Sequence, residues 1–216
     1  MRTDDLIDAL ASDAQASRGR LSLLQRLAMV AGLGALAALG MLLAMLHTRP
    51  DLGEAVLGGM FWMKAAYTAL LGVAGYMAVE RLARPAAGVG RRGWILGGVV
   101  LGLFALVGAI QAMMSPDIQM ALHMLRGHSW RTCSPRILML SLPMLALGLW
   151  VVRGMAPTRP TLAGLAMGLF SGGVAATVYG LHCPEHTFTF VALWYSLGVL
   201  GTAALGALIG RWALRW

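Results

Sequence analysis

The chain has 216 residues, of which 58% are hydrophobic and only 12% are charged, and its mean hydropathy is +0.72. This composition is too apolar for an ordinary soluble domain of this length, so it predicts an integral membrane protein. The net charge of +8 belongs mainly to arginines that flank apolar runs, so we interpret it as membrane anchoring and exclude a nucleic-acid-binding surface.

Residues 1–26 form a polar segment that is too long and too acidic at its start for a cleavable signal peptide. Thr3 is the expected N-cap of a short amphipathic helix from about residue 4 to residue 16. Its first turn is acidic and its apolar residues recur at helical spacing: Asp4, Asp5, Leu6, Ile7 and Leu10. Because an anionic leaflet attracts Lys and Arg, this acidic helix suits a groove on a soluble, basic partner protein, and a solvated tail is the competing interpretation.

Six apolar runs follow, each expected to cross a bilayer core, which takes about 20 residues. The fourth run is the weakest because it is short and carries Pro143. The sequence therefore predicts an all-α, polytopic membrane bundle of six transmembrane helices, with residues 27–216 as one domain after the N-terminal segment. The runs span residues 27–46, 56–79, 94–114, 136–152, 161–181 and 189–210. Glycines inside them favour close helix packing, or are simply common in membrane helices: Gly32, Gly34, Gly40, Gly164, Gly168 and Gly172.

The arginines between the runs predict the orientation. Most lie in the N-terminal segment, the second and fourth connections and the C-terminal tail, which places both termini in the cytoplasm by the positive-inside rule. These are Arg2, Arg18, Arg20, Arg26, Arg81, Arg84, Arg91, Arg92, Arg153, Arg159, Arg211 and Arg215. The opposite side carries Arg49, Arg126, Arg131 and Arg136.

The third connection, residues 115–135, is the longest on the outer side. Its segment SPDIQMALHMLRG predicts a capped helix that rests on the membrane interface, with Ser115 as N-cap, Pro116 at the first helical position and Gly127 after the end.

The two cysteines, Cys133 and Cys183, fall on the outer side at the same membrane depth, just before run four and just after run five. Three interpretations remain open: an inert structural pair or staple, a redox pair that stays reduced until an oxidant arrives, and a metal site. The metal site would combine Cys133 and Cys183 with His182, His186, Glu185 or His128, since thiolate and imidazole ligands suit copper and zinc.

Lys64 is the charge within a run, and we expect it to reach the outer interface or to pair with Asp51 or Glu54. Hydrolase, nucleotide-binding and zinc-protease motifs are absent from the sequence, so an enzyme is not expected and no cofactor is required.

The stretches RTDDLIDALASDA, SWRTC, LHCPE and FVALWYSLG, together with the six runs, resemble the NrsF family of membrane anti-sigma factors. The resemblance covers essentially the whole chain. It implies a protein of the bacterial inner membrane whose cytoplasmic N-terminus holds an extracytoplasmic-function (ECF) sigma factor. It assigns that contact to Asp4, Asp5, Leu6, Ile7 and Leu10.

The resemblance also implies that Cys133 and Cys183 sense a stress on the periplasmic side and trigger release of the sigma factor. We expect the signal to be disulfide formation or binding of a thiophilic metal ion. Two rival functions are a small membrane transporter or metal-handling protein, and a thiol–disulfide membrane oxidoreductase. The rivals are disfavoured by the lack of buried carboxylates and of a CxxC pair, respectively.

Overall fold

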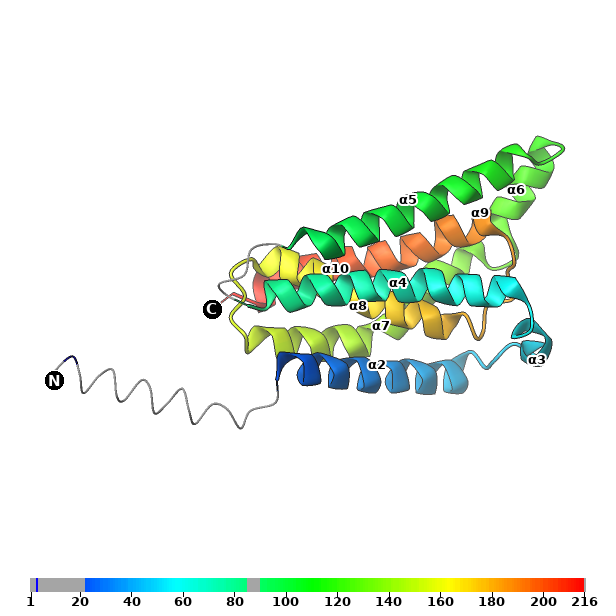
Figure 1. Ribbon diagram of the computed structural model, residues 1–216. Coiled ribbons are helices and arrows are strands. Elements are labelled where there is room, and N and C mark those ends of the chain that lie inside the picture. The colour runs from blue at the N-terminus through cyan, green and yellow to red at the C-terminus, as the bar shows by residue number, and fades with distance from the viewer. Residues whose placement is uncertain (1–2, 4–21, 85–89, 216) are drawn as a thin grey trace.

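The computed structural model describes residue 3, residues 22–84 and residues 90–215, and the regular structure in these residues is entirely helical (Figure 1). The long helices are α2 (Leu23–Met45), α4 (Gly59–Leu82), α5 (Arg91–Met113), α7 (Trp130–Arg153), α8 (Pro160–Tyr179) and α10 (Ser196–Ala213). The short ones are α3 (Leu52–Ala55), α6 (Ile118–Arg126) and α9 (Phe188–Phe190), and a π-helical turn, η2 (Val191–Tyr195), joins α9 to α10. The amphipathic helix predicted for residues 4–16 lies outside the described residues.

Five segments of the described chain are helical, long and apolar enough to cross a membrane. They are α2, α5, the region Ile118–Arg153 that contains α7, α8, and the region Phe188–Ala213 that contains α10. The predicted second span is α4, a helix of 24 residues that lies beside α8 and α5 but is not among these five. It carries Lys64 in its first half and Glu80 and Arg81 near its end. The helical class is confirmed, whereas a count of six spans stays a prediction.

Helix α8 lies at the centre of the bundle, where it packs against α10, α4, α7 and α2. Side chains at Gly164 and Gly168 would overlap the backbone carbonyls of Gly206 and Thr202 on α10. On another face, a side chain at Gly173 would overlap the backbone of α4 at Gly72. These glycines therefore serve the close backbone approach that drives helix association in lipid.

The glycines of α2 divide into two groups. A side chain at Gly34 would overlap Met144 of α7, so this glycine is a packing position. Gly32 and Gly40 face open space, so they make no close helix contact within the described bundle.

The long helices give the bundle two ends (Figure 1), which carry different residues. We call the end that carries α3, α6 and residues 180–187 the cysteine end, and the end where α2 begins and α10 ends the arginine-rich end. Both cysteines lie at the former, because α7 begins and α8 ends there. The described arginines at the latter are Arg26, Arg81, Arg84, Arg91, Arg92, Arg153, Arg159, Arg211 and Arg215.

Three predicted boundaries were wrong. Helix α2 begins at Leu23 rather than at residue 27, because Ser22 and Gln25 form a capping box. The outer helix α6 is capped by Asp117, whose Oδ1 accepts a 2.6 Å hydrogen bond from Met120 N, and not by Ser115. Gly127 after its end was predicted correctly. Helix α7 begins at Trp130 instead of residue 136, so Cys133 lies within its first turns and not ahead of it.

Candidate functional site

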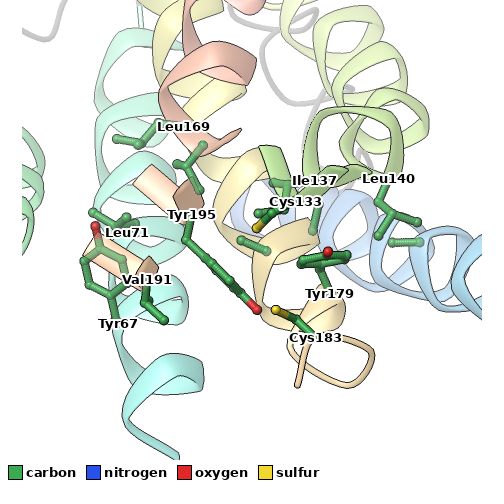
Figure 2. Packing of buried hydrophobic residues seen from close by; sticks show 14 of the residues in the cluster. Tyr67, Leu71, Cys133, Ile137, Leu140, Leu169, Tyr179, Cys183, Val191 and Tyr195 are labelled. Atoms are coloured by element: carbon green, nitrogen blue, oxygen red, sulfur yellow. The ribbon is translucent and has the colours of Figure 1, made fainter. Parts of the chain in front are cut away.

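The two cysteines meet inside the cysteine end, although they come from different parts of the chain. Cys133 is on α7, and Cys183 is in the loop that follows α8. Both side chains are completely buried, at 0% exposure, and both are free thiols. They share one cluster with Tyr179 and Tyr195, and Figure 2 shows the hydroxyl of Tyr195 pointing toward the Cys183 sulfur.

The surroundings of Cys183 favour its thiolate. The neighbouring Cys133 thiol, as a hydrogen-bond donor, lowers the pKa of Cys183 below its ordinary value. Burial opposes this change, while the Tyr195 hydroxyl and the charge of Lys64 support it. The Ser129 hydroxyl lies 3.9 Å from the Cys183 sulfur. Cys183 is therefore the thiol of the pair that we expect to react first as a nucleophile.

The two tyrosines were not singled out by sequence reasoning. Their rings lie 5.8 Å apart between centroids, and their buried hydroxyls have no hydrogen-bond partner of good geometry among the described residues. Tyr179 ends α8 and Tyr195 ends η2, so both face the same depth of the bundle. The signal that could have identified them is their position in the sequence, near the end of run five and near the start of run six.

Lys64 holds the loop that carries Cys183. The residue is 2% exposed, and its ammonium donates hydrogen bonds to the backbone carbonyls of Cys183 at 3.1 Å and Glu185 at 2.8 Å. The predicted ion pair of Lys64 with Asp51 or Glu54 is therefore not formed, and the ammonium instead reaches the backbone of the loop at the cysteine end.

Asp51 binds Arg49 instead, with Nε–Oδ1 and Nη2–Oδ2 distances of 2.7 and 2.5 Å. That bond lowers the pKa of the Asp51 carboxyl to about 2. The Asp51 carboxylate is thus paired with Arg49 within the loop between α2 and α3. Backbone carbonyls of the loop after α8 accept the hydrogen bonds from Lys64.

Glu185 ties the same loop to the start of α7. Its Oε1 accepts hydrogen bonds from His128 N at 2.7 Å, Ser129 N at 3.1 Å and Ser129 Oγ at 3.2 Å. A carboxylate is favoured there because the N-terminal end of a helix carries positive partial charge. Gly127 has a φ of +51°, and a Cβ there would lie 2.5 Å from Glu185 Oε2, so the close approach requires glycine.

The histidines of the proposed metal set are not arranged around the sulfurs. His182 Nδ1 lies 2.8 Å from the carbonyl oxygen of His47, and its Nε2 lies 3.1 Å from Arg136 Nη1. With the Nδ1–H tautomer, His182 donates to His47 and accepts from Arg136. His186 is exposed. Among the described residues, no group of three or more His, Cys, Asp or Glu side chains is arranged to hold a metal ion.

A surface cavity of about 290 Å³ adjoins the loop at the cysteine end. Its lining includes Gly127 and Glu185 together with His123, His128 and His186. Neither cysteine is among its described lining residues. The predicted partner-binding residues Asp4, Asp5, Leu6, Ile7 and Leu10 lie outside the described residues.

Comparison with known proteins places these features in a family context. Residues 10–216 match a family described as negative regulator of sigma F, NrsF. The chain is 68% identical over 217 residues to the anti-sigma-F factor NrsF of Caulobacter vibrioides (strain NA1000 / CB15N), covering 100% of both chains. It is 42% identical over 219 residues to the probable anti-sigma-F factor NrsF of Azospira oryzae (strain ATCC BAA-33 / DSM 13638 / PS), again covering 100% of both. No solved structure matches it.

Proposed function

Because this chain belongs to the NrsF family of negative regulators of sigma F, we propose that it is a membrane-embedded anti-sigma factor. Its cytoplasmic N-terminal segment sequesters a sigma factor of the ECF class. Cys133 and Cys183, on the periplasmic side of a bacterial inner membrane, sense oxidative or thiophilic-metal stress and cause release. The observation that carries this proposal is the meeting of two buried, free thiols at one end of the bundle.

The orientation is supported by the distribution of charge. The arginine-rich end gathers most of the described arginines, as the cytoplasmic side of an inner-membrane protein does. With α4 as a sixth span, the N-terminal end of α2 and the C-terminal end of α10 both lie at the arginine-rich end. The cysteine end then faces the periplasm, where disulfides form and persist.

The redox step is a two-electron oxidation. The Cys183 thiolate attacks an oxygen of hydrogen peroxide, the O–O bond breaks, and Cys183 becomes a sulfenic acid while the leaving hydroxide takes up the proton that the thiol released and departs as water. The Cys133 sulfur then attacks the Cys183 sulfur, the S–O bond breaks, and a second water leaves with the Cys133 proton. The net change joins two thiols and one hydrogen peroxide into one disulfide and two waters. A thiophilic metal ion would bridge the same two sulfurs after displacing their protons.

Closure of the disulfide changes the start of α7. A disulfide holds its sulfurs about 2.05 Å apart, closer than two thiols that only contact each other. The contraction pulls Cys133 against a loop that Lys64 and Glu185 fix to α4 and α7. A switch from 1:99 to 99:1 between two states requires about 5.5 kcal/mol, so the oxidised pair must favour the releasing state by that amount.

Helix α7 is the element that carries this change to the cytoplasmic end. Its segment from Cys133 to Arg153 is about 30 Å long at 1.5 Å per residue, which matches the bilayer core. It packs against α2, and α2 follows directly on the N-terminal segment. A shift of α7 therefore moves the helix to which the sigma-binding segment is attached.

The sensor assignment is tested by replacing Cys133, Cys183 or both with Ser and measuring sigma-dependent transcription under peroxide and under cadmium. We expect both single variants to lose induction while keeping repression in unstressed cells. Induction that persists in the double variant would disprove the sensor role. A variant that loses the response to only one stress would identify the inducing chemistry.

The partner segment is tested with the full-length protein in membranes. Changing Leu6 and Ile7 to Ser should release the sigma factor without stress and weaken its co-purification, because those residues are predicted to face the partner. Ala9→Ser is the matched control on the same segment. Unchanged repression by the Leu6 and Ile7 variant would refute the assigned contact.

A further inference from the structure

Two buried tyrosine hydroxyls lie beside the thiols without a hydrogen-bond partner of good geometry among the described residues. Tyr179 and Tyr195 are both 0% exposed. The Tyr195 hydroxyl points toward the Cys183 sulfur (Figure 2), and the Tyr179 hydroxyl lies beside the Cys133 thiol. An unpaired buried hydroxyl destabilises a folded protein, because it gives up its hydrogen bonds to water and gains none in exchange. Two such hydroxyls in one cluster therefore indicate a partner that the chain itself does not supply.

Tyr67 shows how the same core treats a tyrosine that serves packing alone. It is 2% exposed, and its hydroxyl lies 2.6 Å from Ser196 Oγ. The fold thus supplies a hydroxyl partner for a buried tyrosine where nothing else binds. At the cysteines the polar side-chain atoms nearest to the two tyrosine hydroxyls are sulfurs, which are weak hydrogen-bond acceptors. These hydroxyls therefore keep their capacity to bind a molecule that contains oxygen.

The surroundings of the sulfurs select a small and neutral molecule. Both sulfurs belong to residues with 0% exposure, so a ligand must pass between packed side chains. The surface is close to Cys183, because Pro184 is exposed and the half-buried Ser129 has its hydroxyl 3.9 Å from the Cys183 sulfur. A charged oxidant is penalised there because burial removes its hydration. Hydrogen peroxide is neutral and little larger than water, and both of its oxygens accept hydrogen bonds.

We propose that the hydroxyls of Tyr179 and Tyr195 bind hydrogen peroxide beside the Cys183 sulfur and donate hydrogen bonds to its two oxygens. This inference rests on the proposed function and names its signal as a small, neutral oxidant that transfers an oxygen atom. When the Cys183 thiolate attacks the nearer oxygen, the S–O bond forms, the O–O bond breaks and the sulfur loses two electrons. The farther oxygen leaves as hydroxide, which a tyrosine hydroxyl stabilises until it takes up the proton that the thiol released. Both tyrosines are unchanged at the end of this step.

The test uses the full chain in detergent micelles with Cys133→Ala, so that a sulfenic acid at Cys183 has no thiol to attack it. Dimedone traps that acid, and mass spectrometry gives the rate of its formation by hydrogen peroxide. The rate is divided by the rate of iodoacetamide alkylation, which consumes the same thiolate without transferring oxygen. Both rates are taken at a pH where alkylation no longer accelerates. Because each hydroxyl contributes one hydrogen bond to the transition state, Tyr195→Phe and Tyr179→Phe should each lower this ratio about tenfold.

Tyr67→Phe is the matched control, since it makes the same chemical change in the same core. It should leave the ratio unchanged but lower the melting temperature, because its hydroxyl has a partner to lose. Tyr179→Phe and Tyr195→Phe should not lower the melting temperature of the reduced protein. An unchanged ratio in the variant that carries both of these substitutions, or a fall in its melting temperature as large as that of Tyr67→Phe, would overturn the inference.

The size of the oxidant is tested with cumene hydroperoxide, which transfers oxygen in the same way but is bulky. It should give a lower ratio than hydrogen peroxide in the protein with both tyrosines intact, and an equal ratio would contradict the small-oxidant assignment. The cysteine variants in the transcription assay test the sensor role separately. A tyrosine-dependent ratio together with induction that persists without the cysteines would support the peroxide site and refute the sensor role.

Discussion

Glu185→Ala is the substitution that most directly tests the connection between the cysteine loop and α7. It removes one carboxylate oxygen on which three donors of His128 and Ser129 converge, at 2.7, 3.1 and 3.2 Å. Loss of a helix cap costs about 1 kcal/mol, and a hydrogen bond to a charged group contributes about 1.5–3 kcal/mol. Because water at this end of the bundle can accept some of the hydrogen bonds that Glu185 accepted, we expect the free energy of unfolding to fall by about 3 kcal/mol.

Glu185→Gln separates charge from hydrogen bonding. The amide oxygen still accepts hydrogen bonds, so only the charge at the helix terminus is lost, and the expected cost is about 1 kcal/mol. Reversible unfolding in mixed detergent micelles, followed by circular dichroism, measures both values. The control is Glu54→Ala, an exposed glutamate at the same end, which should change stability by less than about 0.5 kcal/mol. If Glu185→Ala were no more destabilising than this control, the capping argument would fail.

Three further outcomes are expected. Lys64→Met should raise the midpoint pH for alkylation of Cys183 by iodoacetamide by about one unit, because a nearby opposite charge lowers a thiol pKa by about that amount or more. The measurement uses a Cys133→Ser background, in which only Cys183 reacts. An unchanged midpoint pH would contradict this prediction. Gly168→Leu should unfold the bundle or lower its free energy of unfolding by more than about 3 kcal/mol, since the new side chain would overlap the α10 backbone. Gly32→Ala, at a position that faces open space, should change the free energy of unfolding by less than about 1 kcal/mol in the same micelles. Peroxide treatment of the purified protein should join Cys133 to Cys183 within one chain, seen as faster migration on a non-reducing gel; disulfide-linked dimers alone would refute the intramolecular pair.

Much of the architecture was predictable because lipid imposes simple rules on a chain. A run of about 20 apolar residues must be helical to satisfy its backbone, so the long helices were located to within a few residues at most boundaries. The start of α7 was the exception, because WRTCSPR is polar and reads as a loop until Glu185 caps it from a distant segment. The family was also predicted, from SWRTC, LHCPE and FVALWYSLG, and the match over residues 10–216 confirms it.

The candidate site was only half predictable. Cys133 and Cys183 were assigned to one depth from topology alone, and the structure brings them into one buried cluster. The partner of Lys64 was assigned wrongly, since nearby carboxylates were the obvious candidates and the true acceptors are backbone carbonyls. Backbone acceptors have no sequence signature, because every residue carries one.

The sequence by itself determined the helical class, the end of the bundle that gathers most arginines and the end at which both cysteines lie, because these follow from hydropathy and the order of residues along the chain. Only the tertiary structure decided which groups surround the thiols. Tyr195 and Lys64 approach the cysteine loop from η2 and α4, and Glu185 within that loop binds the backbone at the start of α7. These contacts depend on how α4, α7 and α8 pack. The close approach of α8 to its neighbours, where glycines replace side chains, sets those contacts.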